Sequence, residues 1–472
     1  MPELPSSSEL LVAGGDERIR PLAGQRCNKY GISPGPATAS VEFSSSTASH
    51  ISADAFAAVE SLRARLCNAP GEAAMHALYQ QEFSRIRSGF FELCGLQQAE
   101  HAGTGWIVAE SGTDAHFSAV RLAALRFRQP FRIVMPEFIE TGRAVCDTLR
   151  KPNGVDGATV ADIVEVRLRN ADGSLRSIGE IDRDFHTAAL VALAQDIPVL
   201  LIRADESKTG CRAPSADLLH MLVKAAPERV AVLIDACQLR ISRGSLRGYL
   251  VNNYMVALTA SKFFAAPSFC GALMVPPAWR AGLEEITRAD ACSQPSPNPG
   301  LLARWEAGLH TMQQYFAIPA ALRQLLIARF GQAVHAAIQA CPGFDLLARS
   351  AGVAANANTQ DADAGDVNAA TLFAFRVRRV APSRHLTSLE MEQAYRTLQQ
   401  SRHANGSSYL LGQPVACGSQ DFQRTQCLRI SLSATMVIEL SRLPPEEAVT
   451  WLDQQVMTCL QTLKAIVDQQ SS

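Results

Sequence analysis

The hydrophobic pattern of the first hundred residues separates an irregular start from two helices. Residues 1 to about 40 are rich in Ser, Pro and Gly and show no sustained period, which predicts an arm with no fold of its own. From Ser52 to Leu96 apolar residues recur at helical spacing, and the pair Pro70-Gly71 interrupts the pattern. Two consecutive helices are therefore expected in this stretch.

From Leu96 to Pro276 the pattern alternates between short apolar runs and helical segments. The runs FRIVMPE, IPVLLIRA, RVAVLIDA and YMVALTA read as strands, and DAHFSAVRLAALRF and PSADLLHMLVKAAP read as helices between them. Such alternation is typical of α/β proteins in which helices cover a mainly parallel sheet. We expect a large α/β domain over residues 43–315.

The remainder of the chain predicts a smaller α+β domain. Helical patterns cover residues 301–316 and 321–340, and the polar stretch 355–366 reads as a surface loop. A strand, a helix, a strand and a helix are then expected at 371–380, 388–400, 428–434 and 445–467. The predicted division is an N-terminal arm (1–42), partly flexible, the large domain (43–315) and a small C-terminal domain (316–472).

Composition narrows the function classes. The chain has 44 Lys and Arg against 45 Asp and Glu, with no long basic run, which argues against nucleic acid as a partner. No apolar stretch reaches the roughly 18 to 20 residues that cross a bilayer, and the N-terminus lacks the pattern of a secretory signal. We expect a protein of the cytoplasm without a membrane partner. Its 12 cysteines are scattered singly, so no metal site is expected and most should be reduced, buried thiols.

Two ionisable residues end apolar strands. Asp235 ends RVAVLIDA, where a buried carboxylate is costly unless it meets a cation. Lys262 follows YMVALTA, and desolvation there would lower its pKa and make the amine a better nucleophile toward an aldehyde. Alone, such an Asp is more often a turn cap and such a Lys is usually solvated. Together they are the two groups that pyridoxal-phosphate (PLP) chemistry requires: an acid under the pyridine nitrogen and a lysine at the aldehyde.

A candidate phosphate site precedes them. Ser111, Gly112 and Thr113 stand immediately before a predicted helix, whose free N–H groups and dipole attract anions. The alternative is an ordinary helix N-cap. Asp114 in the first turn favours that alternative, since its carboxylate competes for the same positive end.

These motifs resemble the class V aminotransferase group of fold-type-I PLP enzymes, which includes cysteine desulfurases, kynureninases and isopenicillin-epimerase-like proteins. The resemblance runs from Ser44 to the C-terminus. Its most specific parts are D-A-x-Q at 235–238 and T-x-S-K at 259–262, followed by Gly271. Weaker parts are S-G-T-D-A at 111–115, E-S-K-T-G at 206–210 and L-R-I-S-L at 428–432.

The resemblance implies a role for each matching position. Lys262 would carry PLP as a Schiff base, Asp235 would bind the pyridine nitrogen, and Gln238 would reach the phenolic oxygen, with Ser207 near the ring oxygen. Arg429 would clamp the α-carboxylate of an amino-acid substrate, a task that suits a bidentate guanidinium. The phosphate would be held by Ser111, Gly112, Thr113, Thr259 and Ser261. The fold type also implies a homodimer with shared active sites, in which the loop before Leu301 would supply Ser296 or Asn298.

The sequence departs from the family pattern at two positions. Phe138 stands where many members stack a histidine on the ring; it can stack but cannot transfer a proton. Ser261 replaces a histidine common in desulfurases. Cys417, in contrast, lies in the region where sulfur-mobilising relatives place a nucleophilic cysteine, which must be exposed and ionised.

The function expected is therefore that of a PLP-dependent enzyme acting on an amino acid, an aminotransferase-like transferase or a lyase. One alternative is a cysteine desulfurase or C–S lyase that uses Cys417. Another is a PLP-fold protein that binds without catalysis. A weak alternative fold, a dinucleotide-binding protein, rests on the fragment Gly103-Thr104-Gly105, which lacks the full glycine spacing.

Overall fold

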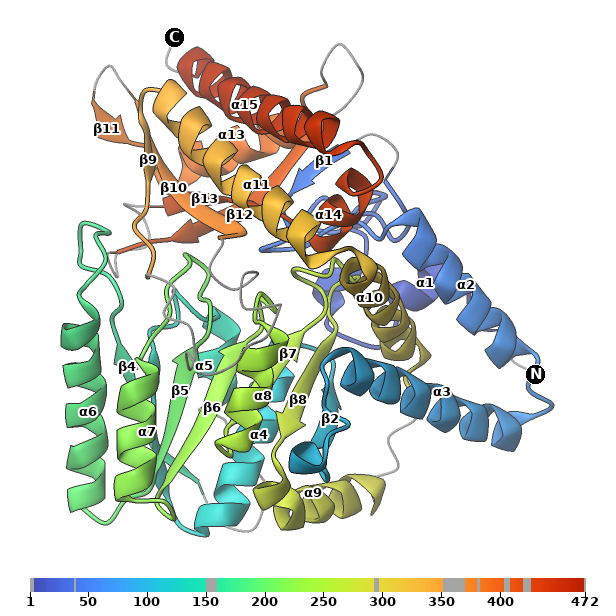
Figure 1. Ribbon diagram of the computed structural model, residues 1–472, viewed down its shortest axis with the longest axis vertical. Coiled ribbons are helices and arrows are strands. Elements are labelled where there is room, and N and C mark those ends of the chain that lie inside the picture. Colours follow the sequence, from blue (N-terminus) through green and yellow to red (C-terminus); the bar gives the residue numbers. More distant parts are fainter. Residues whose placement is uncertain are drawn as a thin grey trace.

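The computed structural model describes residues 4–37, 40–149, 159–292, 297–350, 370–379, 383–402, 408–418 and 426–470. Two sheets organise these residues, a large one in the lower half of Figure 1 and a smaller one above it. Helix α10 (Pro299–Ala317) leads from the large sheet toward the small domain, where α11 (Ala320–Ala340) begins. The predicted fold class, a large α/β domain with a smaller C-terminal α+β domain, is confirmed.

The large sheet has seven strands in the order β2-β8-β7-β6-β5-β3-β4. All neighbouring pairs are parallel except those of β8, which is antiparallel to both β2 and β7. Strands β5, β6, β7 and β8 are buried along their whole length, as continuous apolar runs covered on both faces require. In chain order the strands are β2 (Gly105–Ala109), β3 (Phe131–Pro136), β4 (Val160–Val166), β5 (Val199–Ala204), β6 (Val230–Ala236), β7 (Met255–Thr259) and β8 (Gly271–Val275).

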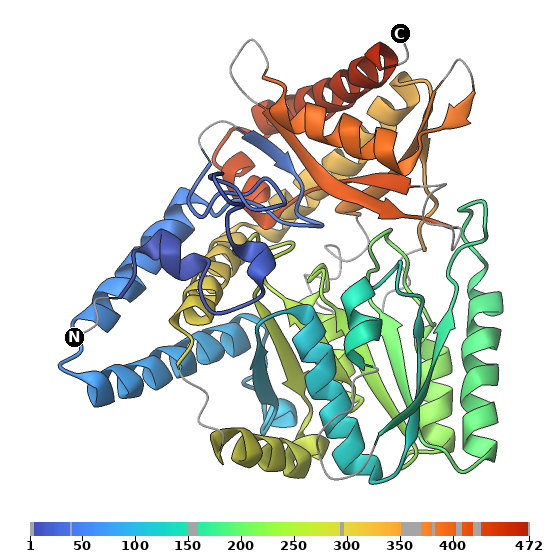
Figure 2. The ribbon, with the colours of Figure 1, turned by 180° about the vertical axis from the view of Figure 1, so that it is seen from behind.

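Helices cover the two faces of this sheet. In Figure 1, α6 (Ile178–Ala194), α7 (Ala216–Ala225) and α8 (Arg243–Val251) lie in front of the strands. Figure 2 shows α4 (Gly112–Phe127) and α5 (Arg143–Leu149) on the other face, with α9 (Arg280–Cys292) at the edge. The two largest core clusters of the described residues follow this division, because alternate strand residues point to opposite faces. The two helices expected before the sheet are α2 (Ala53–Cys67) and α3 (Glu72–Leu93).

The small sheet has the order β1-β12-β13-β10-β11, with β9 also paired to β10. Its strands are β1 (Ser40–Phe43), β9 (Phe344–Leu346), β10 (Leu372–Arg379), β11 (Arg384–His385), β12 (Ser408–Ala416) and β13 (Gln426–Ser431). Helices α11, α13 (Ser388–Gln400), α14 (Ala434–Leu440) and α15 (Pro445–Gln469) complete the domain. The strands and helices expected after residue 370 are therefore present, and the polar stretch 355–366 lies outside the described residues.

The N-terminal segment is tied into both domains. Strand β1 pairs in parallel with β12, Ser40 opposite Ser408, so the expected limit between an arm and the large domain falls inside a strand of the small sheet. Before it, α1 (Ser7–Leu11) packs on α10 and the short helix η1 (Glu17–Ile19) follows. The buried guanidinium of Arg304 donates to the carbonyls of Leu11, Ala13 and Gly14. The division into three parts stays a prediction.

Among the described residues, none of the helices is long and apolar enough to cross a membrane. The same residues contain no group of His, Cys, Asp and Glu side chains that could hold a metal ion. Eleven cysteines are described as free thiols, most of them buried, which agrees with the expectation of reduced packing residues.

Candidate active site

Three strand ends and one helix start meet at one edge of the large sheet. Asp235 lies near the end of β6, Lys262 follows β7, and Gly112 begins α4 after β2. Carboxyl ends of parallel strands share an edge, where open α/β sheets bind ligands. The alternative dinucleotide fingerprint is wrong for this fold. A phosphate-binding glycine turn follows a strand, whereas Gly103 lies before strand β2 and Gly105 is its first residue.

The Lys262 amine is half-buried and held by the N-terminal segment. Its Nζ donates to the carbonyl oxygens of Ser46 at 3.3 Å and Thr47 at 3.0 Å. Burial, followed by repulsion from Arg429 and Lys208, lowers the pKa of Lys262 to about 7. At neutral pH much of this amine is uncharged, as a nucleophile toward an aldehyde must be.

Asp235 pairs with a histidine that the sequence did not single out. The Nε2 atom of His116 on α4 lies 3.4 Å from Oδ2 of Asp235, and Nδ1 of the same ring lies 2.7 Å from the Gly112 carbonyl. Burial works against ionisation of both groups, yet their mutual attraction lowers the pKa of Asp235 and raises that of His116. Asp235 therefore stays a carboxylate although it is almost completely buried.

The start of α4 approaches the strand ends too closely for a side chain. A Cβ atom on Gly112 would lie 2.7 Å from Sγ of Cys237 and 3.2 Å from Cγ2 of Thr259. Ser111 is the N-cap: its Oγ accepts from the Asp114 backbone N–H and donates to the Asp114 carboxylate. The cap is therefore present. It leaves the N–H groups of Gly112 and Thr113 at the first positions of the helix, where no intrahelical acceptor exists.

Two hydroxyls and an amide lie around Lys262. Thr259 Oγ1 donates to the Cys237 carbonyl at 2.8 Å. The buried Ser261 hydroxyl donates to Thr259 Oγ1 at 3.4 Å. Gln238 is buried, and its Oε1 has no hydrogen-bond partner. A buried acceptor without a partner is costly, so this amide is placed for a group that the protein itself does not provide.

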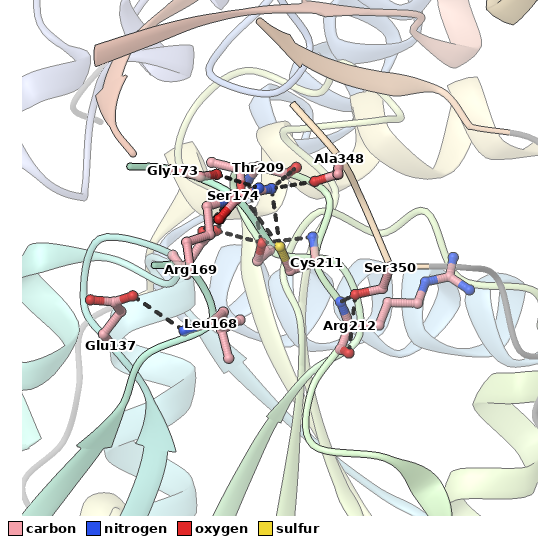
Figure 3. Close-up of polar contacts among 12 residues, drawn as sticks. Glu137, Leu168, Arg169, Gly173, Ser174, Thr209, Cys211, Arg212, Ala348 and Ser350 are labelled. Atoms are coloured by element: carbon pink, nitrogen blue, oxygen red, sulfur yellow. Dashed lines mark hydrogen bonds and ion pairs between the residues drawn. The ribbon is translucent and has the colours of Figure 1, made fainter. Parts of the chain in front are cut away.

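Ser207 lies in a buried network on the neighbouring strand ends. Its Oγ donates to Glu140 at 2.6 Å, and Thr209 donates to the same carboxylate. Arg169, fully buried, adds an ion pair with Glu140 and bonds to Thr209, Gly173 and Ala348 (Figure 3). The Ser207 hydroxyl is thus used within the protein, and the expectation that it approaches a ring oxygen is not supported by its hydrogen bonds.

Phe138 follows β3, and its backbone N–H donates to the Glu165 carboxylate at 2.9 Å. Its ring is half-buried and packs against the core cluster under α4. Glu137 beside it is mostly buried, and burial together with the nearby Glu140 raises the pKa of Glu137 to about 7. This carboxyl is a titratable group next to the position where the family pattern has a histidine.

Arg429 lies on β13 and faces Lys262 across the N-terminal segment. Its Nη1 donates to the Ser46 carbonyl at 3.2 Å, and its Nη2 donates to Thr47 Oγ1 at 2.7 Å and to the Gln413 carbonyl at 2.9 Å. The side chain is buried, and burial lowers its pKa to about 10, so it remains a cation at neutral pH. Arg429 is therefore not a surface strand arginine, and its role as a carboxylate clamp stays a prediction.

Cys417 does not lie in an exposed loop. Its side chain is 0% exposed and packs with Cys427, Ala374 and Leu347. Interaction with the Cys427 thiol lowers the pKa of Cys417, but no solvent reaches the sulfur. The exposure that a nucleophilic thiol needs is missing, because Cys417 directly follows β12, which ends at Ala416, and packs in this apolar cluster.

Of the two residues proposed to cross a dimer interface, Ser296 lies outside the described residues. Asn298 caps α10 through its Oδ1, and its Nδ2 donates to Gly14 and Glu110 of its own chain. Both polar atoms of the Asn298 amide are therefore hydrogen-bonded within its own chain.

The structure adds four groups that the sequence analysis missed: His116, Ser46, Thr47 and Lys208. His116 lies four residues after Gly112, on the same face of α4, and that spacing was the one available signal. Ser46 and Thr47 carry no comparable signal, because they reach the site from far away in the sequence.

Comparisons with known proteins agree on the fold. No family model matches the sequence, and no curated protein matches it. A structure of SPT with a PLP internal aldimine superposes with a TM-score of 0.55 at 14% identity, covering 98% of this chain and 95% of that one. A NifS-like protein gives 0.54 at 13% identity (89% and 99% covered), and serine palmitoyltransferase of Sphingomonas wittichii gives 0.52 at 14% (87% and 84%). The chain has the fold of the fold-type-I PLP-dependent enzymes.

Proposed function

We propose that this protein is a PLP-dependent enzyme that acts on an amino acid, with the cofactor bound to Lys262. The observation that carries the proposal is the placement of Lys262 and Asp235 on adjacent strand ends, beside a helix start that admits no side chain. The finer assignment, a class V aminotransferase-like transferase or lyase, is supported by the D-A-x-Q and T-x-S-K motifs and by the likeness to a NifS-like protein.

The residues present fit PLP. A phosphate would suit the backbone N–H groups of Gly112 and Thr113, which no side chain at position 112 covers, with the hydroxyls of Thr259 and Ser261 beside them. The Nε2 group of the buried Gln238 amide is a hydrogen-bond donor and would suit the phenolic oxygen. PLP, when bound, supplies an aldehyde for the amine of an amino acid and an electron-withdrawing ring that weakens the bonds at Cα.

His116 sets the charge of the acid. A carboxylate buried this deeply would take up a proton unless a cation stood beside it, and His116 is that cation. The imidazole is oriented by the Gly112 carbonyl, which fixes Nδ1 and leaves Nε2 to face Asp235. Asp235 would therefore offer a full negative charge to a pyridine nitrogen bound beside it.

Lys262 moves the proton. Its lowered pKa allows the amine to accept a proton near neutral pH and to return it. Phe138 cannot share this task, so Lys262 is the proposed acid/base group on its face of the site. Arg429 binds the carboxylate of the amino acid and thereby orients Cα toward the lysine.

A desulfurase that uses Cys417 is disfavoured. The thiol is buried, and a nucleophile must reach the substrate sulfur. Cys417→Ser should retain turnover, and release of sulfide from cysteine should not depend on this residue. Loss of activity in Cys417→Ser with an unchanged unfolding midpoint would make a desulfurase the favoured function.

The direct test is the absorbance of the purified protein between the near-ultraviolet and the blue. We expect a band from the bound cofactor, fixation by borohydride, and a peptide map with the modification on Lys262. Modification of Lys208 in its place would overturn the site. A protein that binds PLP at Lys262 but changes no amino acid in a panel of substrates would be a binding protein of this fold.

A homodimer with shared active sites remains part of the proposal. Sedimentation at micromolar concentration measures it: a monomer with full activity would contradict it.

A further inference from the structure

A polar cavity lies between the N-terminal segment and the small domain, beside strand β1 and helix α14 (Figure 1). Its volume is about 230 Å³, somewhat below the roughly 300 to 1,000 Å³ of pockets that hold drug-sized ligands. Residues 40–42 and 49–53 line it from one side, and Ser433, helix α14 and Trp451 line it from the other. None of the residues assigned above to the cofactor lines it. The cavity therefore has room for a small ligand at a place separate from the proposed PLP site.

Two carboxylates line this cavity, and one imidazole accompanies them. Glu42 accepts from the Ser40 hydroxyl at 3.0 Å and from the His50 backbone N–H at 2.9 Å, and its carboxylate also pairs with the His50 ring. The Glu439 carboxylate forms no hydrogen bond or ion pair with another described residue. Partial burial, followed by repulsion from Glu42, raises the pKa of Glu439. One imidazole can offset only one of the two negative charges.

The neighbouring positive charges do not remove this excess. Arg442, which follows Glu439 by three residues, forms an ion pair with Asp54 at 2.6 Å, and Asp54 itself adds to the repulsion at Glu439. Helices α2 and α14 both begin at the cavity, where Ser52 and Ser433 cap them. A helix start carries only about half an elementary charge, less than one carboxylate. The cavity therefore favours a cation.

Two buried hydroxyls at the cavity have no partner. Ser49 is 3% exposed, and its Oγ forms no hydrogen bond with any described residue. The Oγ1 atom of Thr435, at the start of α14, is also buried and lacks a partner among the same residues. Both residues line the cavity. A buried hydroxyl without a partner is costly, so these two are placed for a ligand whose N–H groups they can accept.

We propose that this cavity binds a small organic ammonium ion, held by the carboxylates of Glu42 and Glu439 with the hydroxyls of Ser49 and Thr435 as further acceptors. An ammonium group presents N–H donors and no acceptor, which matches a lining of carboxylates and hydroxyls. Trp451 adds an aromatic wall, and the face of an indole attracts organic cations. A metal ion fits less well, because the described part of the chain has no group of three or more His, Cys, Asp and Glu side chains that could hold one.

The ligand would contact the segment that holds the proposed Schiff-base lysine. Residues 42 and 49 line the cavity, and between them the carbonyls of Ser46 and Thr47 accept from Lys262. Ala265, three residues after Lys262, lines the cavity as well. An ammonium ion bound here would restrain both ends of this segment. Because no cofactor residue takes part in binding, the inference does not depend on the proposed function.

The test is saturation-transfer NMR of the holoprotein with dimethylammonium chloride, compared with tetramethylammonium chloride at the same concentration. Dimethylammonium has N–H donors, and as a secondary amine it forms no neutral Schiff base with an aldehyde, so it does not compete with Lys262. Tetramethylammonium has the same charge and no N–H donor. We expect saturable transfer to the methyl groups of dimethylammonium and weaker binding of tetramethylammonium. Equal affinity for the two ions would contradict recognition by the carboxylates and hydroxyls.

Glu439→Gln should raise the dissociation constant of dimethylammonium at least tenfold, equivalent to about 1.4 kcal/mol. Glu446→Gln is the matched control, since it removes an exposed carboxylate from the first turn of α15 that does not line the cavity. Ser49→Ala keeps every charge and should also weaken binding, by a smaller factor.

Three results would each overturn the inference: no saturable transfer in the wild type, equal dissociation constants in the wild type and Glu439→Gln, or equal losses in Glu439→Gln and Glu446→Gln. The absorbance band expected from bound PLP should be the same in all these variants. Failure of the ammonium site would therefore leave that band in place, whereas failure of the proposed function would remove it from the wild type.

Discussion

Lys262 and Arg429 donate to the same acceptor, the carbonyl oxygen of Ser46, at 3.3 and 3.2 Å. A single peptide group of the N-terminal segment thus separates the proposed Schiff-base lysine from the proposed carboxylate clamp. Besides burial, the Arg429 cation lowers the pKa of Lys262, whereas the guanidinium, with a pKa that burial lowers only to about 10, keeps its charge at neutral pH. Lys262 is therefore the group of this pair whose pKa falls to about 7.

We therefore expect Arg429→Gln to raise the pKa of Lys262. The Arg429 cation disfavours the ammonium form, so its removal must shift the titration of the amine to higher pH. The rate at which cofactor-free protein reacts with an amine reagent, followed against pH and assigned to Lys262 by peptide mapping, measures this shift. Arg378→Gln, a charge loss on the exposed side of β10, should leave the profile where it is.

Arg429→Ala should weaken substrate binding while the cofactor spectrum is retained. Loss of a charge-assisted contact to a carboxylate should raise the amino-acid concentration needed for turnover by one to two orders of magnitude, about 1.4 to 3 kcal/mol. Thr47→Val removes a bond to the same guanidinium and keeps its charge, so its effect should be smaller. Loss of the cofactor in Arg429→Ala would show that the arginine is structural.

Asp235→Asn should separate binding from chemistry. The variant keeps the volume of the side chain and leaves Lys262 intact, but it removes the charge that stabilises a protonated ring nitrogen. We expect PLP to bind and turnover to fall by about two orders of magnitude or more, about 2.7 kcal/mol. Asp205→Asn, at the neighbouring strand end, is the control for a buried carboxylate. Near-native turnover in Asp235→Asn would place the acid away from the ring.

His116→Asn should make the protein less stable at low pH than at high pH, relative to the wild type. The folded pKa of His116 is raised above 6.5, so its pairing with Asp235 stabilises the fold fully below that pH and is lost as pH rises through the folded pKa. Urea midpoints of both proteins between about pH 6 and 9 test the sign. A difference that grows toward high pH would contradict the pairing.

Gly112→Ala should reduce PLP affinity. The new Cβ would lie 2.7 Å from the Cys237 sulfur and would push α4 away from the strand ends. Gly248→Ala is the matched control, because its Cβ would meet no atom within 4 Å inside helix α8. That control should gain about 0.5 to 1 kcal/mol in stability and bind the cofactor normally. Equal cofactor affinity in the two variants would remove Gly112 from the phosphate position.

The local pattern was enough to predict strands β3, β5, β6 and β7 and to single out Asp235 and Lys262, but it missed β1, β4 and β12. Apolar runs bounded by turns gave the strands, and the residue that ends each parallel strand must lie at the ligand edge of the sheet. Asp235 and Lys262 therefore follow from the sequence together with the handedness and direction of α/β units. The covered faces of β5, β6 and β7 follow from the same runs.

Tertiary structure alone decided which groups surround Asp235 and Lys262. Ser46 reaches Lys262 across 216 residues of chain, and His116 reaches Asp235 because α4 packs on β6 and β7. Cys417 was a candidate for an exposed nucleophile but is buried, since burial depends on which distant residues pack over a segment and not on its neighbours in the sequence. Periodicity reports which face of an element is apolar, whereas contacts between distant segments depend on how the elements pack, and so the charge partners of the site appear only in the folded chain.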